Sequence, residues 1–437
     1  MRTNIVHEGA DELSYEIRGI VRIAERLRDF GVDISWENIG DPVAKGEGIA
    51  GWIKEIVSDV IRDDRSFGYS PTKGLPETRA FIAEHRSAET GVRLDAEDIL
   101  FFNGLGDAIS NVYTYLRRSA RVIGPSPAYP THSSAEAAHA GSPHITYALD
   151  PGNGWLPDVD DIRNKVRYNP NIAGILIINP DNPTGMVYPK AVLAEIVSIA
   201  REYGVFVVSD ETYAKLTYGT EPFVPIAEMV GDDVPAIAMR GLSKEVPWPG
   251  SRCGWIEVYN KDRDAAFARY VRTLVDAKML EVCSTTLPQR ALPSILGDGR
   301  YGGLLRKRND DYRRRADIAH EAFSGIPGVL APRPDGAFYY SVVFDESALP
   351  SGGRLPIGSP EARQFIEKEV SGAPADKRFA YYLMASTGIC VVPLSGFNTD
   401  LPGFRMTLLE PDEMRFRDIV GRIADAIRAY AGSGDGE

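Results

Sequence analysis

A lysine in a Pro-rich stretch has the clearest chemical potential in this sequence. Lys244 follows Ser243 and an apolar segment, and Arg252 lies eight residues further on. A lysine amine is a good nucleophile toward an aldehyde once it is deprotonated. Ser243 and Arg252 can bind a phosphate dianion, the arginine through its forked guanidinium group. The stretch therefore indicates a phosphorylated cofactor held covalently by Lys244, or else an ordinary surface lysine in a loop.

A carboxylate and a phenol follow another apolar run. Asp210 stands at the end of this run, and Tyr213 comes three residues later. A carboxylate at a strand end can pair with a pyridinium nitrogen and keep it protonated. Tyr213 can then donate to a phenolate oxygen on the same ring. The alternative interpretation of Asp210 is a helix cap.

Two turns offer further cofactor contacts. Asn182 lies in an Asn-Pro-Asp-Asn-Pro-Thr-Gly turn, where its amide can contact the phenolate oxygen or simply stabilise the turn. Gly104, Leu105 and Gly106 stand between an expected strand and an expected helix, where backbone N–H groups bind phosphate. They are no dinucleotide fingerprint, because Ile109 occupies the place of the third glycine.

An aromatic residue and a late arginine complete the candidate site. Tyr129, in a Pro-Ala-Tyr-Pro turn, can stack on a cofactor ring or serve ordinary packing. Arg405 lies in an apolar segment, and a buried arginine needs an anion, either a substrate carboxylate or an internal carboxylate. The histidines form no metal-binding pattern. We interpret His132 and His139, seven residues apart in an Ala/Ser-rich helix, as solvent-facing or structural.

The elements that must position these residues are short apolar strands separated by helices. Continuous apolar runs of this kind predict an α/β fold whose sheet is covered on both faces, with its site at the carboxyl ends of the strands. The expected strands are 99–102, 120–123, 174–178, 205–208, 236–239 and 255–258, and the expected helices include 14–30, 51–62 and 191–203.

A second region begins near residue 306. A charged helix (306–323) precedes a strand (338–343), a polar stretch with Pro and Gly, and a final helix near 412–430. We expect residues 1–60 to form an N-terminal arm and part of a small domain. Residues 61–305 form the large cofactor-binding domain, and residues 306–437 form the small α+β domain.

Composition limits the possible partners and location. The 437 residues carry a net charge of −12, which argues against nucleic acid and anionic lipid as partners. Three scattered cysteines favour a reducing compartment over a disulfide framework. Residues 1–18 contain no apolar signal region, and no apolar run is long enough to span a bilayer. We expect a cytoplasmic protein with no membrane partner and no metal.

The order of these motifs resembles the class I/II aminotransferases of pyridoxal 5′-phosphate (PLP) fold type I along nearly the whole chain. That family has a large domain with a mostly parallel seven-stranded sheet between helices and a smaller α+β domain. The matching positions are Gly40, Tyr69, Gly104 to Gly106, Tyr129, Asn182, Asp210, Tyr213, Ser243, Lys244, Arg252 and Arg405.

The resemblance implies a role for each matching residue. Lys244 is the Schiff-base lysine, Asp210 holds the pyridine nitrogen, and Asn182 and Tyr213 hold the phenolate oxygen. The Gly104 loop, Ser243 and Arg252 hold the phosphate. Tyr69 reaches the phosphate of a neighbouring subunit, which implies a homodimer with shared active sites. Arg405, with Gly40 and Asn182, binds the substrate, and its guanidinium takes the α-carboxylate.

Within the family, the opening Tyr15-Glu-Ile-Arg18-Gly looks like the alanine (glutamate–pyruvate) aminotransferase branch. There the N-terminal segment crosses the active site, so Tyr15 and Arg18 are expected substrate contacts, unless Arg18 is an exposed helix charge. Two departures bear on the substrate: the Pro-rich loop after Lys244 and a longer 346–377 region, both expected near the substrate entrance.

The expected activity is ping-pong transamination between an L-amino acid and a 2-oxo acid. Glutamate/2-oxoglutarate is the expected nitrogen donor pair, with alanine/pyruvate as partner, and aspartate or an aromatic amino acid as alternatives. Another PLP reaction, such as β-elimination or an aminocyclopropane-forming lyase, stays open. A non-catalytic PLP-sensing regulator is remote, because the enzyme-like pattern begins by Tyr15 and leaves no room for a DNA-binding module.

Overall fold

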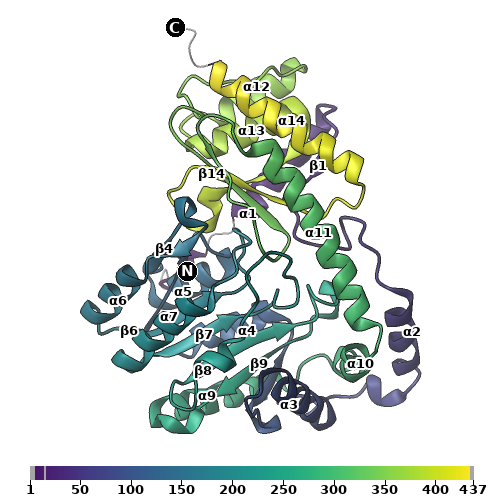
Figure 1. Cartoon of the computed structure of the whole chain (residues 1–437), viewed down its shortest axis with the longest axis vertical. Helices are drawn as coiled ribbons and strands as arrows, with labels where there is room; N and C mark the ends of the chain where they lie inside the picture. The colour runs from purple at the N-terminus through teal and green to yellow at the C-terminus, as the bar shows by residue number, and fades with distance from the viewer. Residues whose placement is uncertain (1–4, 14–15, 434–437) are drawn as a thin grey trace.

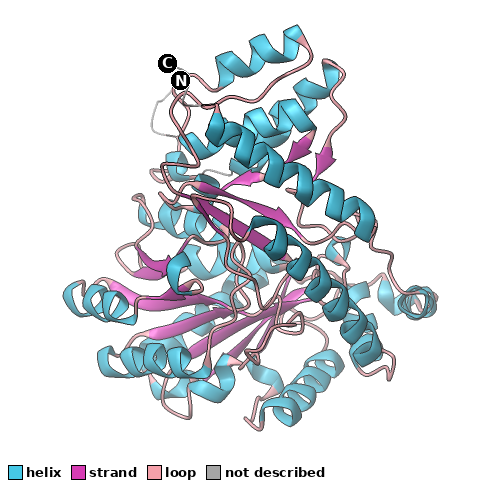
Figure 2. Ribbon diagram, turned by 45° about the horizontal axis from the view of Figure 1, so that its top comes forward, coloured by secondary structure: helices cyan, strands magenta, loops and turns pink. Residues whose placement is uncertain are grey.

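Strands that are apolar along their whole length form the centre of the protein. In the computed structural model, which describes residues 5–13 and 16–433, they build one eight-stranded sheet in the order β2-β9-β8-β7-β6-β3-β4-β5 (Figures 1 and 2). The strands are β2 (Ile99–Phe102), β3 (Arg121–Ser126), β4 (Thr146–Asp150), β5 (Leu156–Pro157), β6 (Ile172–Ile178), β7 (Phe206–Asp210), β8 (Ala236–Gly241) and β9 (Gly254–Tyr259).

The pairing confirms the mostly parallel sheet and corrects its size. Strands β8, β7, β6, β3 and β4 run parallel to one another, whereas β9 runs antiparallel to both β8 and β2. The expected seven strands are joined by β5, which pairs antiparallel with β4. Its two residues, Leu156 and Pro157, are too few to show an alternating pattern in the sequence.

Helices cover both faces of this sheet, and each strand alternates between two cores. Ile175 and Ile177 of β6 pack with α7, while Leu176 and Ile178 pack on the other face with α4. This double burial explains why β6 carries no polar side chain along its length. The helices are α3 (Pro76–Thr90), α4 (Leu105–Thr114), α5 (Pro130–Ala140), α6 (Val159–Tyr168), α7 (Lys190–Tyr203), α8 (Ile226–Met229), α9 (Ala265–Glu281) and α10 (Thr286–Leu296).

A separate antiparallel sheet, in the order β10-β11-β14-β13, forms the small domain. Its strands are β10 (Val329–Leu330), β11 (Tyr339–Phe344), β13 (Val392–Pro393) and β14 (Gly403–Thr407), with a parallel pair of β1 (Ser35–Trp36) and β12 (Ile389–Cys390). One hydrophobic core joins it to its helices. They are α1 (Glu16–Asp29), α11 (Tyr301–Phe323), α12 (Pro360–Glu369), α13 (Ala375–Thr387) and α14 (Glu413–Gly432).

The chain segments before and after the large sheet meet in the small domain. Ile20, Ile23 and Leu27 of α1 belong to the small-domain core, and β1 pairs with β12. Helix α2 (Gly51–Val60) instead lies beside α10, and its Ile53 joins the core of the large sheet. The division of the chain at residues 60 and 305 stays a prediction.

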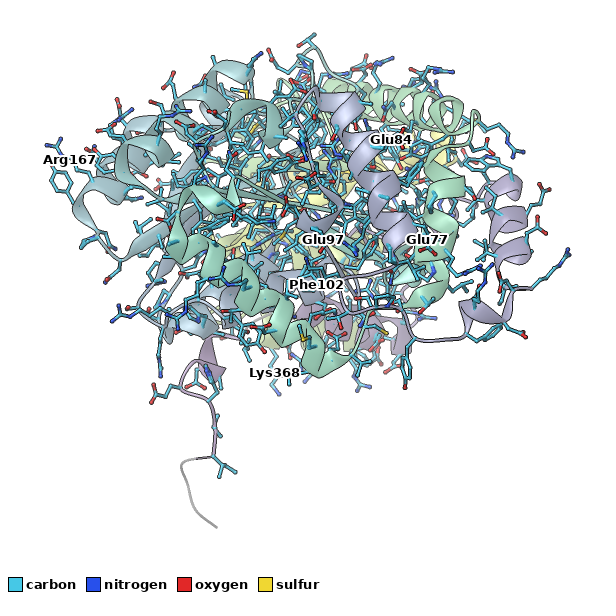
Figure 3. All side chains as sticks on the ribbon, turned by 90° about the horizontal axis from the view of Figure 1, so that it is seen from below. Glu77, Glu84, Glu97, Phe102, Arg167 and Lys368 are labelled. Carbon is cyan, nitrogen blue, oxygen red and sulfur yellow. The ribbon has the colours of Figure 1, made fainter. Side chains whose placement is uncertain are left out.

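Apolar side chains lie inside and charged ones at the edge. Figure 3 shows Phe102 within the body of the molecule and Arg167 extending from its rim, and Phe102 is fully buried.

The segment 346–377 belongs to the small domain: Gly353 packs on Tyr430, and Arg354 N–H donates to the Ser433 hydroxyl at 2.8 Å. Its helix α12 therefore lies at the outer end of the small domain (Figure 1), and the expected position of the region near the substrate entrance stays a prediction. None of the helices described in residues 5–13 and 16–433 has the length and apolar character needed to cross a membrane.

The junction of β1 and β12 depends on one glycine. Gly388 has φ +75°, its carbonyl accepts from Ser35 N–H at 2.8 Å, and an added Cβ would overlap the Asp33 carbonyl. We expect Gly388→Ala to lower the free energy of unfolding by about 2–4 kcal/mol, through backbone strain plus the clash. Gly372→Ala is the matched control, because Gly372 has the same φ but open space around it. We expect it to cost about 1 kcal/mol. Equal losses in urea denaturation would contradict this close packing.

Candidate active site

The carboxyl ends of the parallel strands open into one cavity of about 200 Å³. Asp210 is the last residue of β7, Ile178 is the last of β6, and Ser243 follows β8. Ends of parallel strands meet at one edge of the sheet, so residues distant in sequence converge there. The lining residues are Leu105, Gly106, Ile109, Tyr129, Ile178, Asn182, Asp210, Thr212, Tyr213, Ser243, Lys244, Pro249, Arg252 and Tyr339.

The Lys244 amine is buried in this cavity. Its Nζ donates to the Gly40 carbonyl oxygen at 2.7 Å and lies 5.6 Å from the centre of the Phe338 ring. Burial lowers the pKa of Lys244 to about 8; Arg405 and Arg252 act in the same direction, against Asp41 and Asp210. A substantial neutral fraction near pH 8 makes this amine a nucleophile and a base.

The Asp210 carboxylate is held by a buried chain of hydrogen bonds. Its Oδ2 lies 3.1 Å from His132 Nε2, and His132 Nδ1 lies 3.1 Å from the Tyr113 hydroxyl. This geometry suits an imidazole that donates to Asp210 and accepts from Tyr113. Thr212 N–H donates to Oδ1 at 3.1 Å. Hydrogen bonds to both oxygens therefore fix the orientation of this carboxylate at the carboxyl end of β7.

Two polar side chains face the same space. The Tyr213 hydroxyl lies 2.9 Å from that of Tyr339, and burial raises the pKa of Tyr213 well above its usual value, so it stays a donor. Asn182 is 3% exposed, and its Oδ1 has no hydrogen-bond partner within the described part of the chain. A buried amide oxygen without a partner is costly, which favours a ligand at this position.

The start of α4 forms an anion site at one end of the cavity. Gly104 has φ +86° and precedes the first helical residue, so the N–H groups of Leu105 and Gly106 have no partner within the helix. An added Cβ on Gly104 would overlap the Arg252 guanidinium. Arg252, itself at φ +47°, donates to the Asn103 and Pro249 carbonyls at 3.3 and 3.2 Å. Backbone donors and a cation thus converge on one point.

Arg405 stands behind the cavity in the small-domain sheet. It is 2% exposed, its Nη2 donates to the Asn38 carbonyl, and its guanidinium lies 4.5 Å from the ring centre of Tyr339. Gly40 is close by, since an added Cβ there would overlap the Tyr339 hydroxyl. Tyr339 of β11 therefore forms the small-domain wall of the cavity, and Gly40 and Arg405 lie behind it without lining the cavity themselves.

The structure does not bring every expected residue to this cavity. Tyr15 lies outside the described residues. Arg18 lies in α1, and its side chain is outside the described part. Tyr69 is 87% exposed and does not line the cavity, so its predicted role toward a second subunit stays a prediction.

Comparison with known proteins assigns the family. Residues 45–423 match the family described as Aminotransferase class I and II. The chain belongs to this family. An uncharacterized aminotransferase of Methanocaldococcus jannaschii is 52% identical over 430 residues, covering 98% of this chain and 99% of the relative. The glutamate–pyruvate aminotransferase AlaA of Escherichia coli (strain K12) is 33% identical over 339 residues, or 75% of this chain and 80% of the relative.

Solved aminotransferases share the fold. An alanine aminotransferase from Pyrococcus furiosus superposes with a TM-score of 0.82 at 27% identity, covering 97% of this chain and 99% of that one. The resemblance to class I/II aminotransferases and the predicted fold type are confirmed, as is the assignment of this protein as an aminotransferase enzyme. Relatives named alanine or glutamate–pyruvate aminotransferase are among the matches.

Sequence reasoning missed the position of His132 and Tyr339 at the active site of this aminotransferase. His132 is fully buried beside Asp210, so of the two interpretations offered for it, solvent-facing is wrong. Its helix has no apolar stripe, so its inward face could not be recognised from periodicity. Tyr339 was expected only as part of a core strand. Its partners Tyr213, Gly40 and Arg405 are remote in sequence, and no spacing rule links them.

A third missed residue, Arg308 of α11, joins the lysine loop to the N-terminal segment. Its side chain is 4% exposed, and Nη1 donates to the Lys244 and Glu245 carbonyls, both at 2.8 Å. The guanidinium also pairs with Glu47, which accepts from the Tyr312 hydroxyl at 2.8 Å. Arg308 therefore ties the Lys244 loop to the N-terminal segment that also carries Gly40, the acceptor of the Lys244 amine.

Removing the Arg308 guanidinium should destabilise this aminotransferase strongly. We expect Arg308→Met to lower the free energy of unfolding by about 3 kcal/mol, because it leaves two carbonyls without their donor and the Glu47 carboxylate without its cationic partner. Lys307→Met is the control, because Lys307 pairs with Asp311 while 77% exposed; we expect a loss under about 1 kcal/mol. Similar urea midpoints for both variants would show that the Arg308 contacts carry no such weight.

Proposed function

We propose that this protein is a cytoplasmic PLP-dependent aminotransferase that moves the amino group between glutamate and a 2-oxo acid. The observation that carries the proposal is the convergence of three groups on one cavity: the buried Lys244 amine, the Asp210 carboxylate and the start of α4. A PLP molecule needs an amine for its aldehyde, an acid for its ring nitrogen and an anion site for its phosphate.

The residues present fit this cofactor. Lys244 would hold the aldehyde carbon and Asp210 the ring nitrogen, while Asn182, with its buried oxygen lacking a partner, and Tyr213 would hold the phenolate oxygen. The phosphate would lie on Leu105 and Gly106 N–H, with Ser243 and Arg252 at its sides, and Tyr129 would lie against the ring. Gly104 leaves room for this approach, because any side chain there would meet Arg252.

The chemistry divides between the cofactor and the chain. When bound, PLP supplies an electron sink for the charge that develops at the substrate Cα. Once the substrate amino group had replaced Lys244 at the aldehyde carbon, the freed Nζ, with its lowered pKa, would take the proton from the substrate Cα and deliver it to that former aldehyde carbon. Asp210, held by His132 and Thr212, keeps a negative charge beside the ring nitrogen. Burial of these groups excludes water from the proton transfer.

We expect the substrate on the small-domain wall of the cavity, at Tyr339. Arg405 would bind the α-carboxylate with Gly40 and Asn182 nearby, and Arg18 and Tyr15 would approach the distal carboxylate of glutamate. The relatives named glutamate–pyruvate and alanine aminotransferase support alanine/pyruvate as the second pair, with aspartate as the alternative. A panel of amino donors against 2-oxoglutarate and pyruvate tests this choice. Release of ammonia instead of stoichiometric 2-oxo acid would identify a lyase.

A homodimer is part of the proposal. Phe67 and Tyr69 are 73% and 87% exposed, and Leu280, on a neighbouring segment, is 85% exposed. The two segments are joined where Ser70 Oγ donates to the Ser284 carbonyl at 3.1 Å. Large apolar side chains gathered at one place on a surface favour a protein contact. A second copy here would bring Tyr69 toward the partner's phosphate site.

The proposal is tested at Lys244. We expect Lys244→Ala to lose turnover and the absorbance of the bound cofactor, because the covalent attachment and the proton carrier are both removed. Lys215→Ala is the matched control: burial lowers the pKa of Lys215 to about 8 as well, yet it lies outside the cavity. A borohydride-reducible lysyl–cofactor adduct that survives in Lys244→Ala would show that another lysine is used.

The lowered pKa of Lys244 predicts how cofactor binding depends on pH. Only the neutral amine attacks an aldehyde, so the rate at which apoenzyme recovers its cofactor absorbance should rise with pH, with a midpoint near 8. Asp41 raises this pKa, so Asp41→Asn should move the midpoint to lower pH. A midpoint near 10, as for an exposed lysine, or an upward shift in Asp41→Asn, would contradict the assigned environment.

Arg405 should govern substrate affinity. We expect Arg405→Gln to lower kcat/KM for the amino donor by about 100-fold or more, mainly through KM, because a charge-assisted contact to the carboxylate is lost. Arg405→Lys should recover only part of this, since lysine lacks the fork. Arg415→Gln, whose side chain is 62% exposed, is the control. An unchanged KM in a folded Arg405→Gln variant would place the carboxylate elsewhere.

A further inference from the structure

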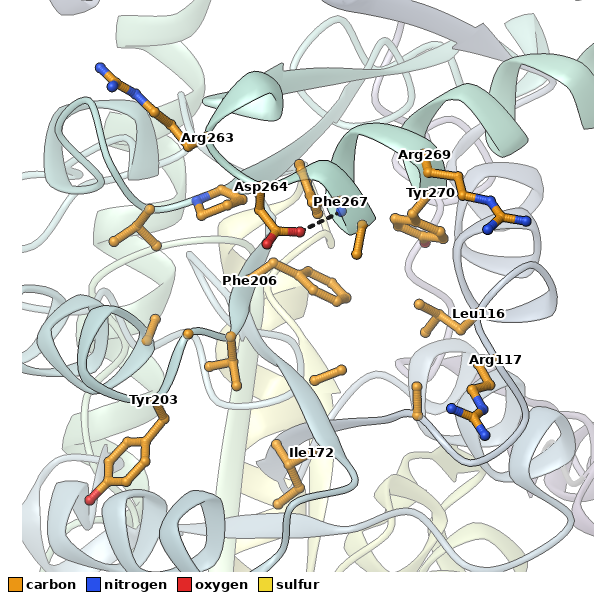
Figure 4. Close-up of a pocket in the computed structure, with 18 of the residues that line it drawn as sticks. Leu116, Arg117, Ile172, Tyr203, Phe206, Arg263, Asp264, Phe267, Arg269 and Tyr270 are labelled. Carbon is orange, nitrogen blue, oxygen red and sulfur yellow. Dashed lines mark hydrogen bonds between the residues drawn. The ribbon is translucent and has the colours of Figure 1, made fainter.

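A second and larger cavity, of about 870 Å³, opens at the edge of the sheet opposite Lys244 (Figure 4). It lies where β6 and β7 begin, at Ile172 and Phe206, whereas the active site lies where the same strands end. Leu116 and Arg117, just after α4, and the first turns of α9 form its other walls. This volume lies in the range of small-molecule sites, about 300–1,000 Å³.

The floor of this cavity is aromatic and firmly packed. The ring of Phe206 lies 5.5 Å from that of Phe267 and 5.9 Å from that of Tyr270. The Tyr270 hydroxyl donates to the Val112 carbonyl at 2.6 Å, which fixes the ring against α4. Figure 4 shows Phe206, Tyr270 and Leu116 around the open space. A flat apolar body can pack on such a surface without rearranging it.

The rim carries an excess of positive charge in a chain of net charge −12. Four arginines line the cavity against two aspartates. Arg201 is used within the protein, because it pairs with Asp233 at 2.6 and 3.0 Å. The second acid, Asp264, accepts from Phe267 N–H at 2.7 Å and so caps α9. Neither aspartate forms an ion pair with Arg117 or Arg269 among the described residues, and the four arginines outnumber the two acids.

The side chains of two of these arginines have no partner in the described part of the chain. Arg263 pairs with Asp232 and extends away from the opening, whereas the guanidinium groups of Arg117 and Arg269 make no ion pair or hydrogen bond among residues 5–13 and 16–433. Figure 4 shows both on the same side of the cavity, with Leu116 between them. Two unpaired forks beside an apolar floor suit an acidic group attached to an apolar body.

We propose that this cavity binds a small amphipathic anion. Its carboxylate, sulfonate or phosphate pairs with Arg117 and Arg269, and its flat apolar part lies over Phe206 and Tyr270. The site is independent of the proposed transamination, since no residue is shared with the Lys244 cavity.

The test uses the holoenzyme and the fluorescent probe 8-anilinonaphthalene-1-sulfonate, which joins an acid to an aromatic body. We expect one saturable component that is weakened about tenfold or more in Arg117→Gln/Arg269→Gln, through loss of both charge-assisted contacts. The control is Arg118→Gln/Arg272→Gln, which changes the same net charge one and three residues away, outside the cavity. We expect the affinity of this control variant for the probe to stay within about twofold of the wild-type value.

A second variant keeps both arginines and fills the space instead. Ala266 lines the cavity from the first turn of α9, so Ala266→Trp should abolish the same component while thermal unfolding and transamination stay unchanged. Equal weakening in the two arginine double variants would indicate general surface charge and overturn the proposal. So would probe binding that is undiminished in Arg117→Gln/Arg269→Gln or in Ala266→Trp.

Discussion

The hydrogen bond from the buried Lys244 amine to the Gly40 carbonyl is the contact on which the active site depends. The lysine comes from the large sheet, while the carbonyl belongs to the segment that leads from the small domain. Closing this contact removes the amine from water, and that burial is the main reason for its lowered pKa. Packing between the two domains therefore sets the reactivity of one nitrogen atom.

A buried ionic cluster joins the strands whose ends lead to Asp210 and Lys244. Glu211 and Glu245 directly follow Asp210 and Lys244 in the sequence. Arg240 pairs with Glu211, and Arg86 pairs with the neighbouring Glu257 at 3.2 Å. Burial alone would raise the pKa of Glu257, but Arg86 and Arg240 hold it below its usual value. Removing one partner of such a cluster leaves a buried charge, so the strand ends are held in one arrangement.

What could be predicted from the sequence follows from how local each feature is. Lys244, Asp210 and Gly104 stand at the ends of apolar strands, and parallel topology then brings such ends together. His132 escaped notice because its helix shows no apolar stripe. Arg308 lies on the inward face of α11, beside Tyr312, Ala316 and Phe323, but its partners Glu47 and the Lys244 carbonyl are remote in sequence. The strand β5 was too short to show a pattern.

The same distinction separates the cofactor end of the site from the substrate end. The cofactor groups come from the large sheet alone, so each can be recognised from a strand and the turn after it. The substrate end combines Tyr339 with Gly40 and Arg405 from three separate segments, and its shape depends on how the domains pack. A chain of net charge −12 repels anions at long range. Recognition of a carboxylate therefore depends on the few arginines that are held in low-dielectric surroundings. There the attraction between the guanidinium and a carboxylate in contact with it is strong, because water and salt screen it little.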